Sequence, residues 1–250
     1  MTNKVRNWKS VGCSILLVGL MLLSGWVNLI GNENRLDDSP TVQRISATGS
    51  LSADTQTNSS LPTNTYGSAS NLMIGDTDFT NARLLVSFDL IMGSGGSLPA
   101  TASIESASLN LFCSRFSILP VGRTLIYPAT LLTSFNESNA NYNESNSSVN
   151  WNTPGADGVG TDRDHWEPPT AVTISSSASV GINITAQVQD ALRSGSTSLS
   201  LVLSALGQPV FCASSEHPTS GSRPSLDFTY SLSGTPNSQD TVTVEGPSSG

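Results

Sequence analysis

The residue types best suited to acid–base catalysis are scarce in this chain of 250 residues. His165 and His217 are its only histidines, and imidazole is the commonest general acid or base in enzymes. His165 lies close to two acidic residues in residues 164–167 (DHWE), but such a pair in a polar loop is more often a solvated surface feature. The chain also has no G-x-S-x-G, H-E-x-x-H or Walker-type loop. We therefore expect a protein that is not an enzyme.

Three aspartates with metal-ligating potential lie close together in a glycine-rich segment. Asp157, Asp162 and Asp164 fall in ADGVGTDRD, and Ca²⁺ prefers carboxylate and carbonyl oxygens from flexible loops. Their spacing does not fit an EF-hand, and a solvated acidic loop is the alternative. The sequence thus predicts a Ca²⁺ site here, with Asp54 and residues 76–78 (DTD) as a weaker second set.

Two of the three cysteines lie in apolar, strand-like segments. Cys113 and Cys212 remain when Cys13, which lies in an N-terminal apolar run, is set aside. An even pair in an exported domain favours a disulfide. Two buried free thiols, which pack like small apolar side chains, are the alternative.

The start of the chain has the order of a secretory signal. Lys4, Arg6 and Lys9 precede an apolar run over residues 11–23. The apolar character continues to Ile30 with no tidy cleavage site, so residues 1–31 are either a cleaved signal peptide or an uncleaved signal-anchor helix. Both alternatives place the remainder outside, so we expect an extracellular or surface-anchored protein that touches membrane only through this segment, if it is uncleaved.

Charge and composition exclude one class of partner and mark two linkers. The formal net charge is −8, and residues 52–232 hold 14 acidic against 6 basic side chains, so nucleic-acid binding is not expected.

Polar, aperiodic sequence at residues 32–51 predicts a linker. Residues 233–250 predict a Ser/Thr/Pro-rich linker or tail, which leaves room for further modules of a longer protein.

Between these linkers, short apolar stretches alternate with turn signals. Residues 82–91 (ARLLVSFDLI) alternate with the period of two that is typical of a strand. Similar strands are expected at residues 71–75, 104–113, 124–132, 172–175, 181–185, 198–204, 210–213 and 225–232. A single short helix is expected at residues 186–193, capped by Thr185 and stopped by Gly195. Many short strands predict an all-β fold, a jelly-roll-like β-sandwich over residues 52–232, with a long polar insertion at residues 135–169.

The order of several short motifs resembles a known family. The motifs are ADT at residues 53–55, RLLVSFD at 83–89, SASLNL at 106–111, VNWN at 149–152 and RPSLDFTY at 223–230. Together they resemble the DNRLRE domains, also classed as carbohydrate-binding module family ninety-six and related to disaggregatase repeats. The resemblance implies a jelly roll in surface proteins that binds polysaccharide, with alginate-like uronates among the ligands. A chain of charge −8 would repel such a polyanion unless an arginine cluster or bound Ca²⁺ compensates.

Polysaccharide binding needs flat aromatic faces and planar polar partners. The candidates are Tyr66, Arg83, Tyr127, Trp151, Trp166, Glu216 and His217. The sequence favours an exposed Trp166 and a packed Trp151, and leaves Arg83 open between a buried ion pair and a ligand contact. The leading hypothesis is a non-catalytic carbohydrate-binding module of an exported protein. A structural or adhesive spacer is the alternative, and a polysaccharide-degrading enzyme is the third.

Overall fold

The computed structural model describes residues 42–77, 80–90, 102–115 and 121–233. The predicted signal or anchor segment at residues 1–31 lies outside the described residues, as does the tail from residue 234 onward. No described helix is long and apolar enough to cross a membrane.

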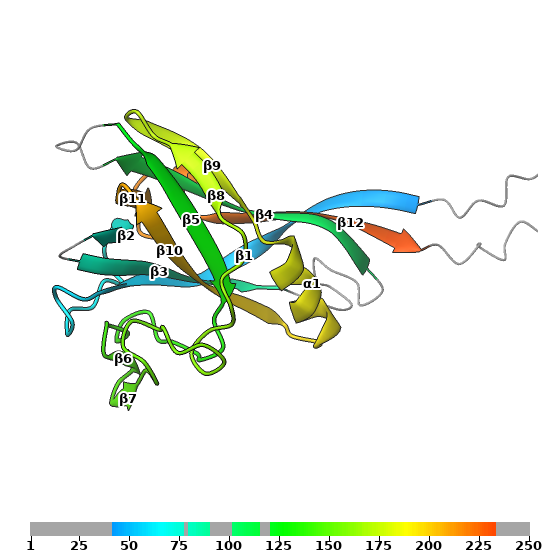
Figure 1. The fold of residues 1–250 in the computed structure, drawn as a ribbon. Helices are drawn as coiled ribbons and strands as arrows, with labels where there is room; N and C mark the ends of the chain where they lie inside the picture. Colours follow the sequence, from blue (N-terminus) through cyan, green and yellow to red (C-terminus); the bar gives the residue numbers. More distant parts are fainter. Residues whose placement is uncertain (1–41, 78–79, 91–101, 116–120, 234–250) are drawn as a thin grey trace, which may run out of the picture. The chain divides into compact units, whose positions relative to one another are not determined.

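The described residues form twelve strands, one α-helix and one short 3-10 helix (Figure 1). The strands are β1 (Val42–Asn58), β2 (Asn71–Thr77), β3 (Thr80–Asp89), β4 (Ala102–Arg115), β5 (Arg123–Thr130), β6 (Glu144–Asn146), β7 (Val149–Asn150), β8 (Thr170–Thr173), β9 (Ser177–Asn183), β10 (Ser198–Gly207), β11 (Val210–Ala213) and β12 (Ser225–Ser233). The helices are α1 (Thr185–Arg193) and η1 (Ser220–Ser222). The all-β class with one short α-helix is therefore as expected.

Two sheets share strands and form a sandwich that nearly closes into a barrel. The first sheet holds β12, β4, β9 and β11, and the second holds β3, β10, β5 and β8. β1 pairs with β12 over its first half and with β3 over its second, and the register shifts between Leu51 and Ala53 where it changes sheet. β2 likewise pairs with β11 and then with β3. The pairings are antiparallel except one short parallel contact between β10 and β2.

β1 corrects the predicted boundary of the domain. It begins at Val42, inside residues 32–51, and pairs with β12 from Val42 to Gly49. The linker interpretation is therefore wrong for residues 42–51. This strand could not be recognised from the sequence, because its residues are mainly polar and do not alternate with apolar ones. Its pairing with β12 is what defines it.

Period-two alternation places one set of β3 side chains inside and the other outside. Leu84, Val86 and Phe88 are fully buried in the main core between the sheets. Arg83 and Leu85 point to the opposite face of the second sheet, where Leu85 joins a separate cluster. The second sheet is consequently covered on both faces along part of its length.

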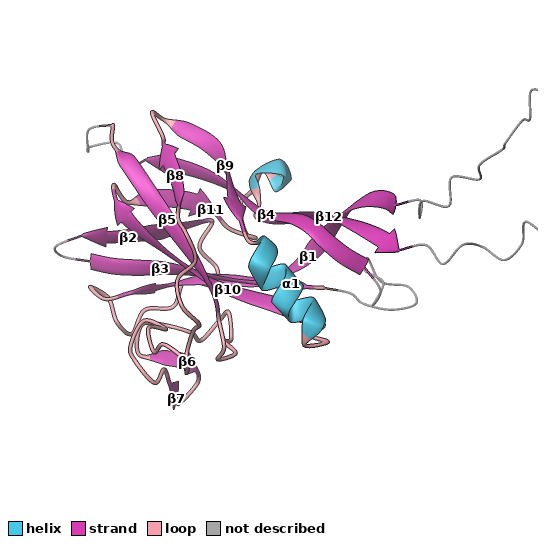
Figure 2. Ribbon diagram, turned by 45° about the vertical axis from the view of Figure 1, so that its right-hand side comes forward, coloured by secondary structure: helices cyan, strands magenta, loops and turns pink. Residues whose placement is uncertain are grey.

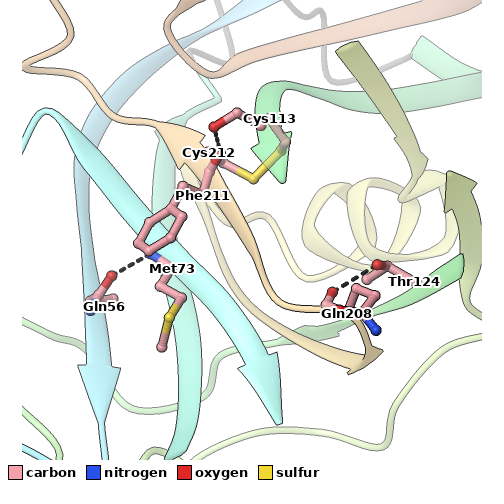
Figure 3. The surroundings of a disulfide bond; sticks show 8 residues. Gln56, Met73, Cys113, Thr124, Gln208, Phe211 and Cys212 are labelled. Carbon is pink, nitrogen blue, oxygen red and sulfur yellow. Dashed lines mark hydrogen bonds between the residues drawn. A yellow bond between two sulfur atoms is a disulfide. The ribbon is translucent and has the colours of Figure 1, made fainter. Parts of the chain in front are cut away.

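A disulfide joins the two sequence-distant cysteines across neighbouring strands (Figure 3). Cys113 of β4 lies directly opposite Cys212 of β11, and the S–S distance is 2.02 Å. Both side chains are fully buried in the main core. Of the two alternatives drawn from sequence, the bonded pair is the one present here.

The helix α1 packs over one end of the sandwich (Figure 2). It buries Val188 and Ala191, and Leu192 packs against the main core, as the apolar spacing predicts. The predicted cap is wrong by one residue, because Ile184 is the N-cap. Thr185 Oγ1 instead accepts a hydrogen bond from the Ala107 amide of β4 at 2.9 Å.

The long insertion packs on the outer face of the second sheet. Its β6–β7 hairpin lies on the side of β3 and β10 in both ribbon views. Trp151 and Ala156 from the insertion pack with Leu85 of β3 and Val202 of β10 in a second hydrophobic cluster. This insertion therefore covers part of that face and leaves the rest of it open beside β5.

Candidate functional site

A small groove with two aromatic side chains lies on the outer face of the second sheet. It encloses 180 Å³ and is lined by Tyr127, Trp166, Ser204, Ala205 and Leu206. Tyr127 of β5 stands directly opposite Ser204 of β10 in the strand register. Both aromatic side chains are partly buried, and Leu206 is 56% exposed. The groove therefore offers aromatic and aliphatic surface with a hydroxyl at its side.

Trp166 reaches this groove because its segment follows the edge of β5. The Asp164 amide donates to the Thr130 carbonyl at 2.9 Å, and the Glu167 amide donates to the Pro128 carbonyl at 2.9 Å. Through these bonds, residues 164–167 run beside β5 and continue the edge that β8 forms further along the same strand. The sequence favoured an exposed Trp166, whereas the side chain is partly buried and packs against the second cluster.

Two arginine side chains lie over the Trp166 ring. The Arg163 guanidinium carbon lies 4.0 Å from the ring centroid, and that of Arg83 lies 5.8 Å from it, which are cation–π distances. Arg163 donates from Nη2 to Asp157 Oδ1 at 2.7 Å, and Arg83 Nη2 lies 3.1 Å from Asp157 Oδ2. One carboxylate thus bridges both guanidinium groups and fixes the support under the indole.

Neither arginine is available to a ligand from solvent. Arg83 and Arg163 are 5% and 6% exposed. Arg83 donates from Nη1 to the Gly155 carbonyl at 2.7 Å, while its buried Nε has no hydrogen-bond partner. Of the alternatives drawn from sequence for Arg83, the buried ion pair is the one present.

The predicted grouping of three aspartates into a Ca²⁺ site is wrong in its geometry. Asp162 is 1% exposed, and its carboxylate accepts hydrogen bonds from the amides of Asn152, Thr153 and Gly158 at 2.8–3.0 Å. Asp157 is engaged by the two arginines, and exposed Asp164 accepts a hydrogen bond from the His165 amide. The three side chains therefore have separate partners, and Asp162 acts as a brace for the turn.

A different group of carboxylates assembles around Asp54 of β1. Oxygens of Asp54, Glu137 and Glu216 lie within 4.8 Å of one another, and among the described residues this is the group with metal-ligating geometry. Asp54 is fully buried, Glu137 is partly buried and Glu216 is exposed. These are the residues that could hold a hard cation such as Ca²⁺, although acidic groups often gather without one.

Ser215 lies at the centre of this acidic cluster. Its amide donates to Asp54 Oδ2 at 2.8 Å. Its Oγ lies 2.8 Å from Asp54 Oδ1 and 2.7 Å from Glu216 Oε1. A hydroxyl has one proton to donate, so both Oγ contacts are hydrogen bonds only when a carboxyl group is protonated and donates to Ser215. Burial raises the pKa of Asp54 to about 6. The hydrogen bonds from Ser215 lower this pKa, whereas repulsion from the charges of Glu216 and Glu137 raises it further.

The remaining sugar-binding candidates lie apart from the groove. Trp151 is 4% exposed and donates from its indole nitrogen to the Asn141 carbonyl at 2.8 Å, so it is a packed anchor. Tyr66 packs against the main core. Glu216 belongs to the acidic cluster, and His217 shapes a turn in which its Nδ1 accepts from the Thr219 amide at 3.2 Å. Of the seven predicted residues, Tyr127 and Trp166 line the groove and Arg83 supports it.

The outer face of the first sheet has a larger and more polar groove. It measures 770 Å³ and is lined mainly by hydroxyl, amide and acidic side chains. The lining includes Ser106, Ser108, Asn183, Asp227 and Thr229. This groove offers hydrogen bonds, and the aromatic residue in its described lining, Phe228, is buried.

The chain matches no protein-family model and no curated protein. The resemblance to the DNRLRE domains therefore stays a prediction. Function is inferred from the geometry described above, which includes Arg163, Ser204 and Glu137. The sequence did not single out Ser204 or Glu137, because these two residues join their sites only through contacts between separate strands and loops.

Proposed function

We propose that the protein is a non-catalytic polysaccharide-binding module whose ligand lies in the groove between Tyr127 and Trp166. This proposal rests on one observation: Tyr127 and Trp166, which are distant in sequence and partly exposed, both line the groove beside the Ser204 hydroxyl. Apolar clefts with a few polar groups are typical small-molecule sites. A pyranose presents a flat C–H face to an aromatic ring and hydroxyls at its rim, which suits this combination.

The support beneath Trp166 strengthens the proposal. A ring held by Arg163 at 4.0 Å loses little conformational entropy on binding, because its orientation is already restricted. The Trp166 ring is partly buried, and the Arg163 contact restricts its motion further. Preorganisation of this kind is expected of a recognition element rather than of a surface residue without a role.

Two alternatives have less support. Catalysis by the acidic cluster would need substrate to reach Asp54, whose side chain is fully buried; paired carboxylates in glycosidases flank the scissile bond directly. A structural or adhesive spacer is favoured by the hydroxyl-lined face of the first sheet. That alternative predicts no role for Tyr127.

The test is affinity electrophoresis of the full chain through gels containing mannan, cellulose derivatives, pectin, alginate or chitin derivatives. We expect retardation by at least one polymer, and loss of that retardation in Tyr127→Ala. Phe112→Ala is the matched control, because Phe112 is an exposed aromatic (36%) on the first sheet and should not matter. No retardation by any polymer, or equal loss in both variants, would refute the proposal.

Ca²⁺ enters the same experiment as a separate variable. Running each gel with Ca²⁺ and with a chelator tests whether a Ca²⁺ site, as predicted from the sequence, takes part in binding. Because the described lining of the groove holds no carboxylate, we expect the retardation to persist under chelation.

A further inference from the structure

The charges around the aromatic groove bear on which polysaccharide it takes. None of the described residues that line it is charged. A ligand carboxylate placed there would lose water without gaining an ion pair, which costs free energy. The hydroxyls of a neutral sugar need only hydrogen bonds, and the groove has a hydroxyl at Ser204.

Acidic side chains flank Trp166 along the edge of β5. Asp164 is exposed, and Glu167 is partly exposed. The hydrogen bond from the His165 amide lowers the pKa of Asp164, so this carboxylate is ionised at neutral pH. Asp164 does not line the aromatic groove but lines a separate groove of 420 Å³ at the other end of β5 and β10, together with Asp190. The described lining of that separate groove holds no lysine or arginine.

The arginines near Trp166 do not offset this negative charge toward solvent. Arg163 uses Nε and Nη2 on Asp157 and Nη1 on the Asp164 carbonyl. Arg83 shares the same Asp157 and is buried. Arg123 of β5 is exposed, but it precedes Tyr127 by four residues, roughly 13 Å along the strand. It could meet only a more distant sugar of a polymer.

We infer that the Tyr127–Trp166 groove selects neutral polysaccharides and rejects uronate polymers, an inference that rests on the proposed function. The acidic residues beside Trp166 repel a polymer with a carboxylate on each sugar, and the buried guanidinium groups cannot reach it. The net charge of −8 acts in the same direction at longer range.

The test compares polymers that share a backbone and differ in charge. Suitable pairs are methyl-esterified and de-esterified galacturonan, neutral glucan and its C6-oxidised form, and mannan and mannuronan. In affinity electrophoresis of the full chain at low salt, we expect each uronate to bind roughly fivefold more weakly than its neutral counterpart, as two repulsive surface contacts predict. At high salt, roughly 0.5 M NaCl, the ratio should shrink, because charges beyond a few ångströms are then screened.

A double variant, Asp164→Asn with Glu167→Gln, removes the two flanking charges while keeping side-chain size. It should leave binding of the neutral polymer unchanged and improve binding of the uronate at low salt. Equal or stronger binding of the uronate by the unmodified chain would overturn the inference while leaving the proposed function intact. Failure to bind any polymer of either class would instead refute the proposed function.

Discussion

Replacing Asp54 by asparagine should change how the stability of the domain depends on pH. Burial raises the pKa of Asp54 from 3.8 to about 6 in the folded protein. A raised folded-state pKa means that the folded protein holds the proton more tightly than the unfolded chain does. The stabilisation is therefore fully present below pH 3.8 and is lost as pH rises through 6.

The size of this effect follows from the shift. One pKa unit corresponds to about 1.36 kcal/mol, so a shift from 3.8 to about 6 is worth about 3 kcal/mol between the two limits. The asparagine of the Asp54→Asn variant cannot titrate, but its side chain can still accept from the Ser215 amide and donate to Ser215 Oγ, so the fold should survive. The free energy of unfolding of the natural chain, minus that of the variant, should therefore rise by about 3 kcal/mol as pH falls from roughly 8 to below 4.

The assay is urea-induced unfolding followed by tryptophan fluorescence between about pH 3.5 and 8, a range that brackets both pKa values, with the disulfide intact. Taking the difference in the free energy of unfolding between the natural chain and the variant cancels the contributions of groups that titrate alike in both. Two further variants should move the midpoint of the difference curve in opposite directions. Glu216→Gln removes a repulsive charge and lowers the pKa of Asp54, whereas Ser215→Ala removes a hydrogen bond and raises it. A difference that stays flat across the pH range would show that Asp54 does not titrate as the acidic cluster requires.

Three other substitutions test the scaffold and the groove. Cys113→Ala with Cys212→Ala opens a loop with a sequence separation of 99 residues and should lower the free energy of unfolding by about 4–5 kcal/mol in the chain-entropy model; a urea midpoint equal to that of the oxidised chain would contradict this. Asp162→Ala leaves three amides without their acceptor and should cost about 2–4 kcal/mol, with faster proteolysis of the insertion; unchanged cleavage would argue against the brace. Arg163→Lys loses its paired contacts with Asp157 and its planar stacking on Trp166, so polysaccharide affinity should fall and the fluorescence spectrum should shift, whereas unaltered affinity would mean that the ring needs no support.

Much of the β-sandwich was predictable because period-two alternation is a local property of the chain. Residues 198–204 and 225–232 alternate cleanly, and they coincide with most of β10 and β12. The predicted range 210–213 coincides with β11. No strand was predicted over residues 42–58, so β1 was missed along its whole length, because its sequence lacks clear alternation and its partners β12 and β3 define it.

The candidate site was predictable in its residue types and wrong in part of its grouping. Tyr127 and Trp166 were recognised as aromatic candidates, and Trp151, also among the candidates, is buried as the sequence favoured. Asp157 and Asp162 are neighbours in sequence, but one bridges two arginines and the other caps three amides. Spacing along a loop does not determine where carboxylates point, because the loop's backbone path depends on the sheet beneath it.

The sequence by itself determined the strand-rich class, the short helix and the two aromatic side chains that a sugar site would need. Only the tertiary structure decided which residues meet: Trp166 with Tyr127 across an edge of β5, and Asp54 with Glu137 and Glu216 around one serine. The physical reason is that strand patterning acts over a few residues. Contacts between β5 and residues 163–167, or between β1 and residues 137 and 216, depend on strand register and on the burial that holds the sandwich together.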